Sequence, residues 1–355
     1  MIHSLLFSLM LAPVLPADSA YSSVQIRPAG SDMVLTSASI DIPASQGYEH
    51  HASEIYAQFA WPRTGWIHGY RVELVDGNGA VLPQEFLHHA GIANLDRRAL
   101  IDSRAERIIA AGTETDAVML PPSMGLPMRT GQQLVLYFAT ANLSGHDVRS
   151  AHLRVTFAWT DASAPNVRDA FPVYLGAQPT ASDSVTFDVP PGRSVTSSEF
   201  ILPLNGSFRA MGGHLHDYGR EIRLEDVATG KVLVLLKAHN SADGRITGVD
   251  RTKFLTKRNG LHLEAGRRYR IVAVYDNPTC AVVHGSMGLV GGPFLPDDTS
   301  AWPAIDPRDA TLAADIRELT TPALSSMPGA HNHHASHEDH SMSALGQATS
   351  CGAAY

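Results

Sequence analysis

Two histidines separated by one residue, His214 and His216, lie in a glycine-bracketed stretch at residues 208–219 whose residue types suit metal binding. The following run, residues 221–227, alternates polar and apolar side chains, which is typical of a β-strand. The pair is therefore expected at a strand end, where residues i and i+2 point to the same side with roots roughly 6.5–7 Å apart. Such a pair can bind zinc, copper, iron or nickel. Taken alone, an isolated His-x-His of this kind is better interpreted as two solvated histidines on a polar face.

A methionine and another histidine follow in the glycine-containing segment 284–289. Two imidazoles and the thioether of Met287 form a soft ligand set that stabilises Cu(I) and tolerates Cu(II). A methionine inside a glycine-rich turn is unusual for core packing, although methionine is a common core filler. His284 is an alternative third ligand. With Met287 as the third ligand, the set at His214 and His216 therefore suits copper.

A second histidine pair, His88 and His89, occupies adjacent positions. Neighbouring residues of a regular strand point to opposite faces, so these two share a metal ion if the strand is bulged or ends there. Otherwise one of them is buried and the other exposed. Four further histidines are expected to be solvated or hydrogen-bonded: His50, His51, His239 and His262.

The composition narrows the classes of function. The 355 residues carry a net charge of −8, which does not suggest a nucleic-acid partner, and 18 histidines and 10 methionines outnumber 2 cysteines. Cys280 and Cys351 can form at most one disulfide, so no disulfide framework is predicted. Residues 1–20 resemble a signal peptide, because their apolar run is too short for a membrane span and small residues follow it. No later run is long and apolar enough to cross a membrane, so an exported protein, periplasmic or secreted, is expected.

Short alternating segments punctuated by turns predict an all-β fold with two tandem antiparallel jelly-roll or β-sandwich domains. The first spans residues 21–178 and the second residues 184–296, with a small-residue link at 176–183. Residues 297–355 are expected to form a helix from Asp306-Pro307 to about Thr320, then a flexible tail with five histidines and Met342 that suits metal binding. One more short helix is predicted near residues 95–104. Strands are expected at 54–61, 66–75, 81–94, 133–142, 149–159, 185–189, 199–204, 207–216, 221–227, 232–236 and 269–275.

In this order of parts the chain resembles the copper type II, ascorbate-dependent monooxygenases of the peptidylglycine α-hydroxylating type. That family has two tandem jelly-roll domains, with a His-His pair in the first and a His-x-His followed by a Met in the second. Residues 66–89 and 134–159 resemble the first domain, and residues 208–219 and 284–289 resemble the metal-bearing segments of the second. The resemblance spans about residues 38–296. It implies an electron-transfer copper at His88 and His89, and an oxygen-activating copper at His214, His216 and Met287.

The chain departs from the family at the third ligand of the first copper, where residues 139–141 read Ala-Thr-Ala. His68, His146 and His152 are possible substitutes, though none matches the family pattern. The resemblance implies hydroxylation of a C–H bond in a small-molecule or peptide substrate, with O2 and with ascorbate or another reductant as electron donor. Two alternatives remain: a copper-binding or copper-delivery protein without turnover, and a β-sandwich binding module whose histidines are structural. Whether the chain is an enzyme is left open, as are its oligomeric state and substrate.

Overall fold

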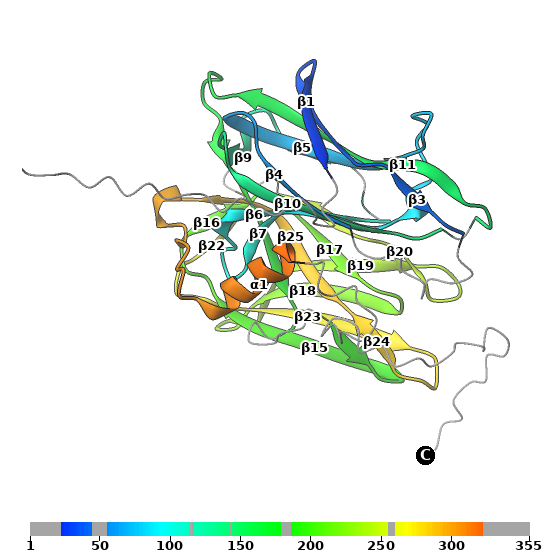
Figure 1. Ribbon diagram of the computed structural model, residues 1–355. Helices are drawn as coiled ribbons and strands as arrows, with labels where there is room; N and C mark the ends of the chain where they lie inside the picture. Colours follow the sequence, from blue (N-terminus) through cyan, green and yellow to red (C-terminus); the bar gives the residue numbers. More distant parts are fainter. Residues whose placement is uncertain are drawn as a thin grey trace, which may run out of the picture.

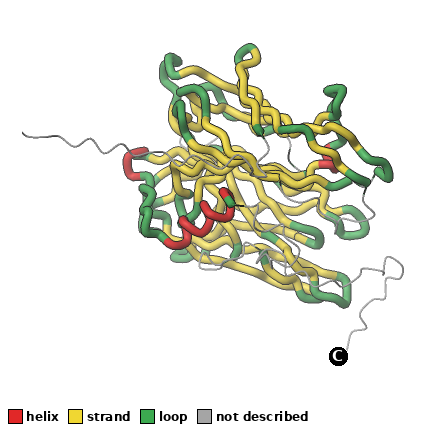
Figure 2. Tube along the Cα trace, viewed as in Figure 1, coloured by secondary structure: helices red, strands yellow, loops and turns green. Residues whose placement is uncertain are grey.

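Two β-sandwiches lie one above the other in the computed structural model (Figure 1), which describes residues 23–44, 55–113, 115, 117–142, 144–178, 186–254 and 260–321. Figure 2 shows that strands make up most of the described chain, with loops at the sandwich edges and little helix. The predicted all-β fold with tandem antiparallel sandwiches is confirmed. The predicted signal segment and the His-rich tail lie outside the described residues.

The first sandwich packs an eight-stranded sheet against a four-stranded sheet. Its core is built from residues that alternate along the strands, such as Leu35, Phe138 and Phe157, each 0% exposed. The eight-stranded sheet contains β1 (Val24–Ala29), β2 (Asp32–Ser37), β3 (Ile40–Ile42), β5 (Gly65–Val75), β8 (Val118–Met119), β9 (Met124–Met128), β11 (Val148–Asp161) and β12 (Arg168–Asp169). The four-stranded sheet contains β4 (Ile55–Ala60), β10 (Gln133–Thr140), β6 (Leu87–Arg98) and β7 (Ala105–Gly112), and the 3-10 turn η1 (Gln84–Phe86) precedes β6.

The second sandwich packs a six-stranded sheet against a five-stranded sheet around a separate core. The six-stranded sheet contains β13 (Phe171–Gly176), β16 (Gly206–Phe208), β17 (Ala210–Leu215), β21 (Arg251–Lys253), β22 (Leu261–Leu263) and β25 (Gly288–Pro296). The five-stranded sheet contains β15 (Gly192–Ile201), β23 (Arg268–Asn277), β18 (Gly219–Asp226), β19 (Lys231–Asn240) and β20 (Ile246–Val249). A separate ribbon joins β14 (Phe187–Val189) to β24 (Val283–Ser286).

The strand β13 links the two sandwiches. The sequence places it inside the first domain, residues 21–178, but it pairs antiparallel with β25, so that Tyr174 lies opposite Gly291. Strand β13 also contacts β7 and β9 of the first sandwich. The four-stranded sheet of the first sandwich and the six-stranded sheet of the second are therefore neighbours across the domain junction.

The helix predicted at residues 95–104 does not form, and this prediction was wrong. Residues 95–98 continue β6, and the chain then turns, with the backbone N–H of Ala99 donating to the carbonyl of Arg104 at 2.8 Å. Arg98 pairs with Ala105 of β7 across this turn. Sheet pairing on both sides of the turn overrides a local helix preference, which is a weak determinant by comparison.

The C-terminal helix α1 (Ala310–Thr320) begins three residues after the predicted start. Asp309 is the N-cap, because its carboxylate accepts from the backbone N–H groups of Thr311 and Leu312. Helix α1 packs against β4, β7 and β10, where Leu319 joins a small apolar cluster. The chain thus returns from the second sandwich to cover the first, after the 3-10 turn η2 (Thr299–Ala301).

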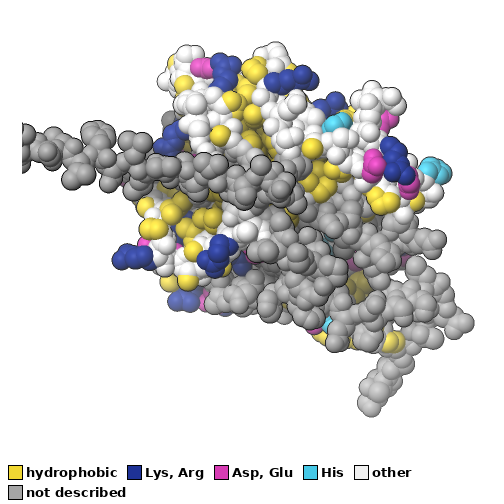
Figure 3. All heavy atoms as spheres, viewed as in Figure 1, with side chains coloured by type: hydrophobic (Ala, Val, Ile, Leu, Met, Phe, Trp, Pro, Cys, Tyr) yellow, Lys and Arg dark blue, Asp and Glu magenta, His cyan; other side chains and the backbone are white. Residues whose placement is uncertain are grey.

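The surface drawn in Figure 3 carries charged side chains of both signs in small, separate groups among apolar and neutral ones. Within the described residues, no helix combines the length and the apolar character needed to cross a membrane.

Candidate functional site

The adjacent histidines of the first sandwich lie at a β-bulge. In the pairing of β6 with β10, Ala139 lies opposite His89 and Thr140 lies opposite Leu87, so His88 is the extra residue of the bulge. The bulge re-aims the strand locally, and the His88 and His89 rings lie 5.0 Å apart between centroids with their planes inclined by 55°. The strand is therefore bulged at this pair, as a metal ion shared by His88 and His89 would require.

The His-x-His pair of the second sandwich lies at a strand end, as the sequence predicts. Strand β17 ends at Leu215, and the His214 and His216 rings lie 5.1 Å apart between centroids with nearly perpendicular planes, at 88°. Leu215 points into the core and is 1% exposed, whereas both histidines are half-buried on the opposite face. Gly213 also faces the core, where a Cβ atom would come within 2.6 Å of Val249. Close core packing thus fixes the face on which the histidines emerge.

Both pairs have the ring separation that a shared metal ion requires. Two imidazoles that bind one ion through nitrogen at about 2.0–2.1 Å, with a near-tetrahedral angle at the ion, hold their ring centroids roughly 5 Å apart. Within the described part of the chain, no third histidine, cysteine, aspartate or glutamate joins either pair. An ion at either pair would therefore need a ligand of another type, such as a thioether or water.

The His89 side of the four-stranded sheet faces the second sandwich. His89 and Gly91 are two residues apart and share a face, and Gly91 lies opposite Tyr137 of β10. Burial raises the pKa of Tyr174 on β13 well above its ordinary value, and the phenols of Tyr70 and Tyr137 add to this rise.

The His214 side of the six-stranded sheet faces the first sandwich in the same way. His214 shares its face with Gly212, which lies opposite Gly291 of β25, and Gly291 in turn lies opposite Tyr174. The two histidine pairs therefore emerge from sheet faces that meet across the domain junction, with Tyr137 on one face and Tyr174 on the other.

Met287 lies beside His216 where the strand pairing ends. Strands β17 and β25 pair through His214 opposite Leu289 and Leu215 opposite Gly288, and one further step of this register brings His216 opposite Met287. Met287 is half-buried and does not belong to the buried core. This position agrees with a ligand role better than with core filling.

A buried tyrosine ties these two backbones together. The hydroxyl of Tyr275 on β23 accepts a hydrogen bond from the His216 backbone N–H at 3.0 Å and donates to the Met287 carbonyl. Tyr275 is 1% exposed, and burial raises the pKa of its phenol, so it stays protonated and able to donate. Its ring packs edge-on against Phe187, 5.6 Å between centroids. Sequence reasoning missed Tyr275, because a tyrosine in an apolar strand reads as ordinary core.

The other candidate histidines have different partners. His284 is exposed and pairs with Asp188, with 2.9 Å between Nδ1 and Oδ1. His68 is 5% exposed, and its Nδ1 lies 2.7 Å from the Met124 carbonyl. His152 is held by the Ser37 carbonyl at 3.0 Å, and His146 is exposed. None of the three substitutes for a third ligand joins His88 and His89 in a metal-binding group of the described residues.

The residues beside the first pair are small. His89 lies between Ala139 on β10 and Gly112 on β7. Ala139 is therefore the cross-strand position nearest the pair, and it carries no metal-binding group. The missing third ligand noted in the sequence at residues 139–141 therefore lies directly opposite His89.

Comparison with known proteins adds little to this geometry. No protein-family model matches the chain, and no curated protein matches it. Three solved structures share 9–10% identity with it: N-glycanase F (PNGase F), with a TM-score of 0.37 over 73% of this chain and 95% of that one; the STIV MCP, at 0.34 over 82% and 99%; and the mavirus major capsid protein, at 0.28 over 84% and 97%. Similarities this low carry no argument about function.

Proposed function

We propose that this chain is an exported copper protein that works as the copper type II, ascorbate-dependent monooxygenases do. The observation that supports this best concerns both histidine pairs. In each pair the rings lie about 5 Å apart, and the two pairs emerge from sheet faces that meet at the domain junction. When bound, copper would supply one-electron redox chemistry and the activation of O2 for hydroxylation of a C–H bond. Ascorbate or another reductant is the proposed electron donor, and a small molecule or peptide is the proposed substrate.

The chain's own residues would hold and orient the two ions. His214, His216 and the thioether of Met287 make a mixed nitrogen and sulfur set, which favours Cu(I) while tolerating Cu(II). Tyr275 fixes the backbone on both sides of this set, so that His216 and Met287 keep their spacing. His88 and His89 would hold the second ion at the bulge.

A copper-binding or copper-delivery protein without turnover is the second candidate. It is favoured by one specific observation: Ala139 and Gly112 flank His89, where a monooxygenase of this family carries a third ligand nearby. A two-ligand site binds copper more weakly and exchanges it more readily than a three-ligand site.

Copper stoichiometry of the full-length chain separates these functions. The five tail histidines, His331, His333, His334, His337 and His340, are first replaced by glutamine, so that copper bound by the tail is not counted. Two coppers per chain are expected, falling to one in His214→Ala/His216→Ala and to one in His88→Ala/His89→Ala. His239→Ala, which alters an exposed histidine paired with Asp250, is the matched control and leaves two.

Oxygen uptake then tests turnover. The monooxygenase proposal expects ascorbate-dependent O2 consumption above that of an equal amount of free copper, lost in both double variants. One copper per chain with no such uptake supports the delivery protein instead. Unchanged copper binding in His214→Ala/His216→Ala rejects both candidates and leaves a binding module with structural histidines.

A further inference from the structure

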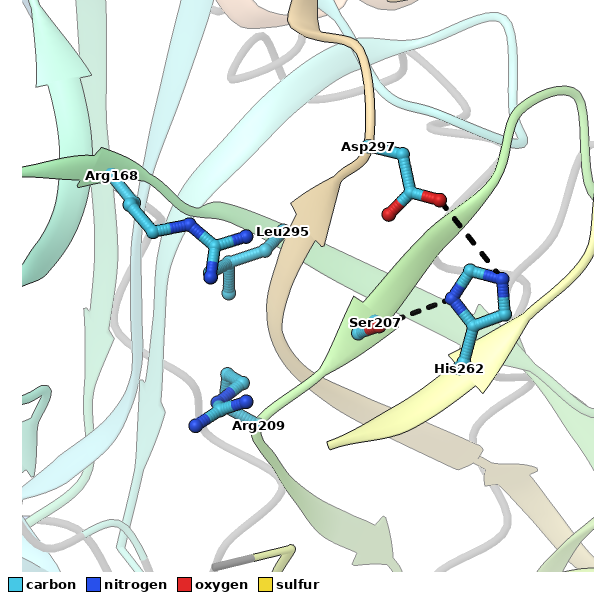
Figure 4. A pocket seen from close by; sticks show the side chains of 6 residues that line it. All are labelled: Arg168, Ser207, Arg209, His262, Leu295 and Asp297. Atoms are coloured by element: carbon cyan, nitrogen blue, oxygen red, sulfur yellow. Dashed lines mark hydrogen bonds and ion pairs between the residues drawn. The ribbon is translucent and has the colours of Figure 1, made fainter. Parts of the chain in front are cut away.

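A polar pocket of about 340 Å³ lies where β12 of the first sandwich meets the edge of the second, away from the histidine pairs. Six residues line it (Figure 4): Arg168, Ser207, Arg209, His262, Leu295 and Asp297. Its volume is at the lower end of the range for small-molecule sites. The elements that bring these residues together come from both sandwiches, so the pocket exists only in the assembled fold.

Two guanidinium groups dominate the pocket. Arg168, on β12, is exposed and lines the pocket from the first sandwich, while Arg209 lines it from the second (Figure 4). Counting Asp297 as the lining carboxylate, the fixed charge of the pocket is 2 − 1 = +1, whereas the whole chain carries −8. Guanidinium groups that line one pocket from both sandwiches can give an anion charge-assisted hydrogen bonds.

The backbone aims Arg209 at the pocket. Strand β16 pairs with β25 so that Phe208 lies opposite Phe294, and β17 pairs with β25 so that Gly212 lies opposite Gly291. The chain between Phe208 and Gly212 is therefore one residue longer than the facing part of β25, which makes a β-bulge. Arg209 is in this bulge, and its N–H donates to the Pro293 carbonyl at 3.2 Å. The bulge thus re-aims the Arg209 side chain at the point where β16 and β17 meet.

Ser207 and His262 add further hydrogen-bonding groups to the lining. Ser207 Oγ lies 3.2 Å from Nδ1 of His262, and Nε2 of His262 lies 4.0 Å from a carboxylate oxygen of Asp297. Ser207 is 7% exposed, so its hydroxyl is fixed in place. The planar guanidinium fork matches the oxygens of a phosphate group in a bidentate way, and a serine hydroxyl can donate to a further oxygen.

We infer that this pocket binds a small molecule through a phosphate-class oxyanion, a phosphoryl or sulfuryl group held between Arg168 and Arg209. The inference is independent of copper, because none of the lining residues belongs to either histidine pair.

Inorganic phosphate is the probe, titrated into the full-length protein at constant ionic strength with chloride as the balancing anion and binding followed by calorimetry. Saturable binding at one site is expected, with sulfate competing and acetate competing much less. Arg168→Gln should weaken phosphate binding by about threefold to tenfold, since it removes a charge-assisted contact from a partly exposed group. Arg168→Lys, which keeps the charge but loses the fork, should fall between the wild type and Arg168→Gln.

Arg27→Gln is the matched control, because Arg27 is an exposed arginine on β1 that does not line the pocket. Arg209→Gln provides a second variant, and its unfolding midpoint in chloride shows whether it has folded. Equal weakening by Arg27→Gln and Arg168→Gln would mean general charge attraction and overturn the site. Acetate binding as tight as phosphate overturns the phosphate class, and absence of saturable phosphate binding overturns the inference altogether.

Discussion

Replacing Tyr275 by phenylalanine tests whether the buried hydroxyl holds the His-x-His pair and Met287 in register. The variant keeps the ring and its edge-on contact with Phe187, but it removes the acceptor of the His216 N–H and the donor to the Met287 carbonyl. Two hydrogen bonds are lost at once, and two backbone groups beside the proposed metal site lose their partner.

The expected magnitude follows from those two bonds. A net contribution of about 1 kcal/mol for each hydrogen bond, with a further penalty for a stranded buried group, gives a loss of roughly 2–3 kcal/mol in the free energy of unfolding. Copper affinity at His214 and His216 should fall by about tenfold, the lower end of the effect of removing a group that orients metal ligands.

Tyr269 offers a matched control on the same strand. Tyr269 is also buried, at 2% exposed, and its hydroxyl accepts one hydrogen bond, from the Glu264 N–H at 2.9 Å. It lies opposite Asp226 of β18, away from the turn that carries His216. Tyr269→Phe should cost about 1 kcal/mol and leave copper affinity unchanged.

The assay uses the chain without tail histidines and with His88→Ala/His89→Ala, so that one proposed copper site remains. Urea unfolding gives the free energy, and competition with a chelator gives the copper affinity. If Tyr275→Phe and Tyr269→Phe bind copper equally well, the hydroxyl does not position the ligands, and the reasoning about Tyr275 is refuted.

Three further predictions concern other parts of the fold. Ala139→His supplies a third imidazole opposite His89, where directly paired residues have Cβ atoms about 4.5–5.5 Å apart, so copper affinity at the first pair should rise at least tenfold by chelator competition. Asp315→Ala removes the carboxylate that holds Arg107 at 2.7 Å and leaves a largely buried charge, so urea unfolding should show a loss of about 2–3 kcal/mol. The pKa of Asp226 lies below its usual 3.8 because an arginine donates to its carboxylate, so Asp226→Asn should lower stability at pH 7, and the difference from wild type should shrink as the pH falls below about 4 in pH-dependent urea unfolding.

Each of these has its own check. The gain from Ala139→His should vanish in a His89→Ala background, and a gain that persists there would place the new ligand elsewhere. Asp161→Ala breaks an ion pair whose two side chains are about half exposed, so a loss as large as that of Asp315→Ala would contradict the burial argument. A wild-type advantage over Asp226→Asn that is unchanged at pH 3 would rule out the carboxylate as its source.

The sequence alone determined the elements and the way single strands present their side chains. Alternation of apolar and polar residues predicts eleven strand segments, and most of these lie within a few residues of an observed strand. Strands such as β1, β2, β7 and β13 were not predicted. The period of two already brings His214 and His216 to one face. The start of a helix predicted at Asp306-Pro307 is equally local, although Asp309 rather than Asp306 caps α1. These features depend on neighbours within a few residues, so they can be read from the chain itself.

Tertiary structure decided how those elements combine. The bulge at His88 depends on the register of β6 against β10. The pairing of β13 with β25 turns the His214 face toward the first sandwich, and Tyr275 reaches His216 and Met287 from another strand. Residues far apart in sequence meet only through such strand pairing, and a shift of one residue in register moves a side chain to the opposite face of the sheet. The histidines and Met287 of the candidate site could therefore be named from the sequence, whereas Tyr275 and the orientation of both pairs toward the domain junction follow from the packing of the two sandwiches.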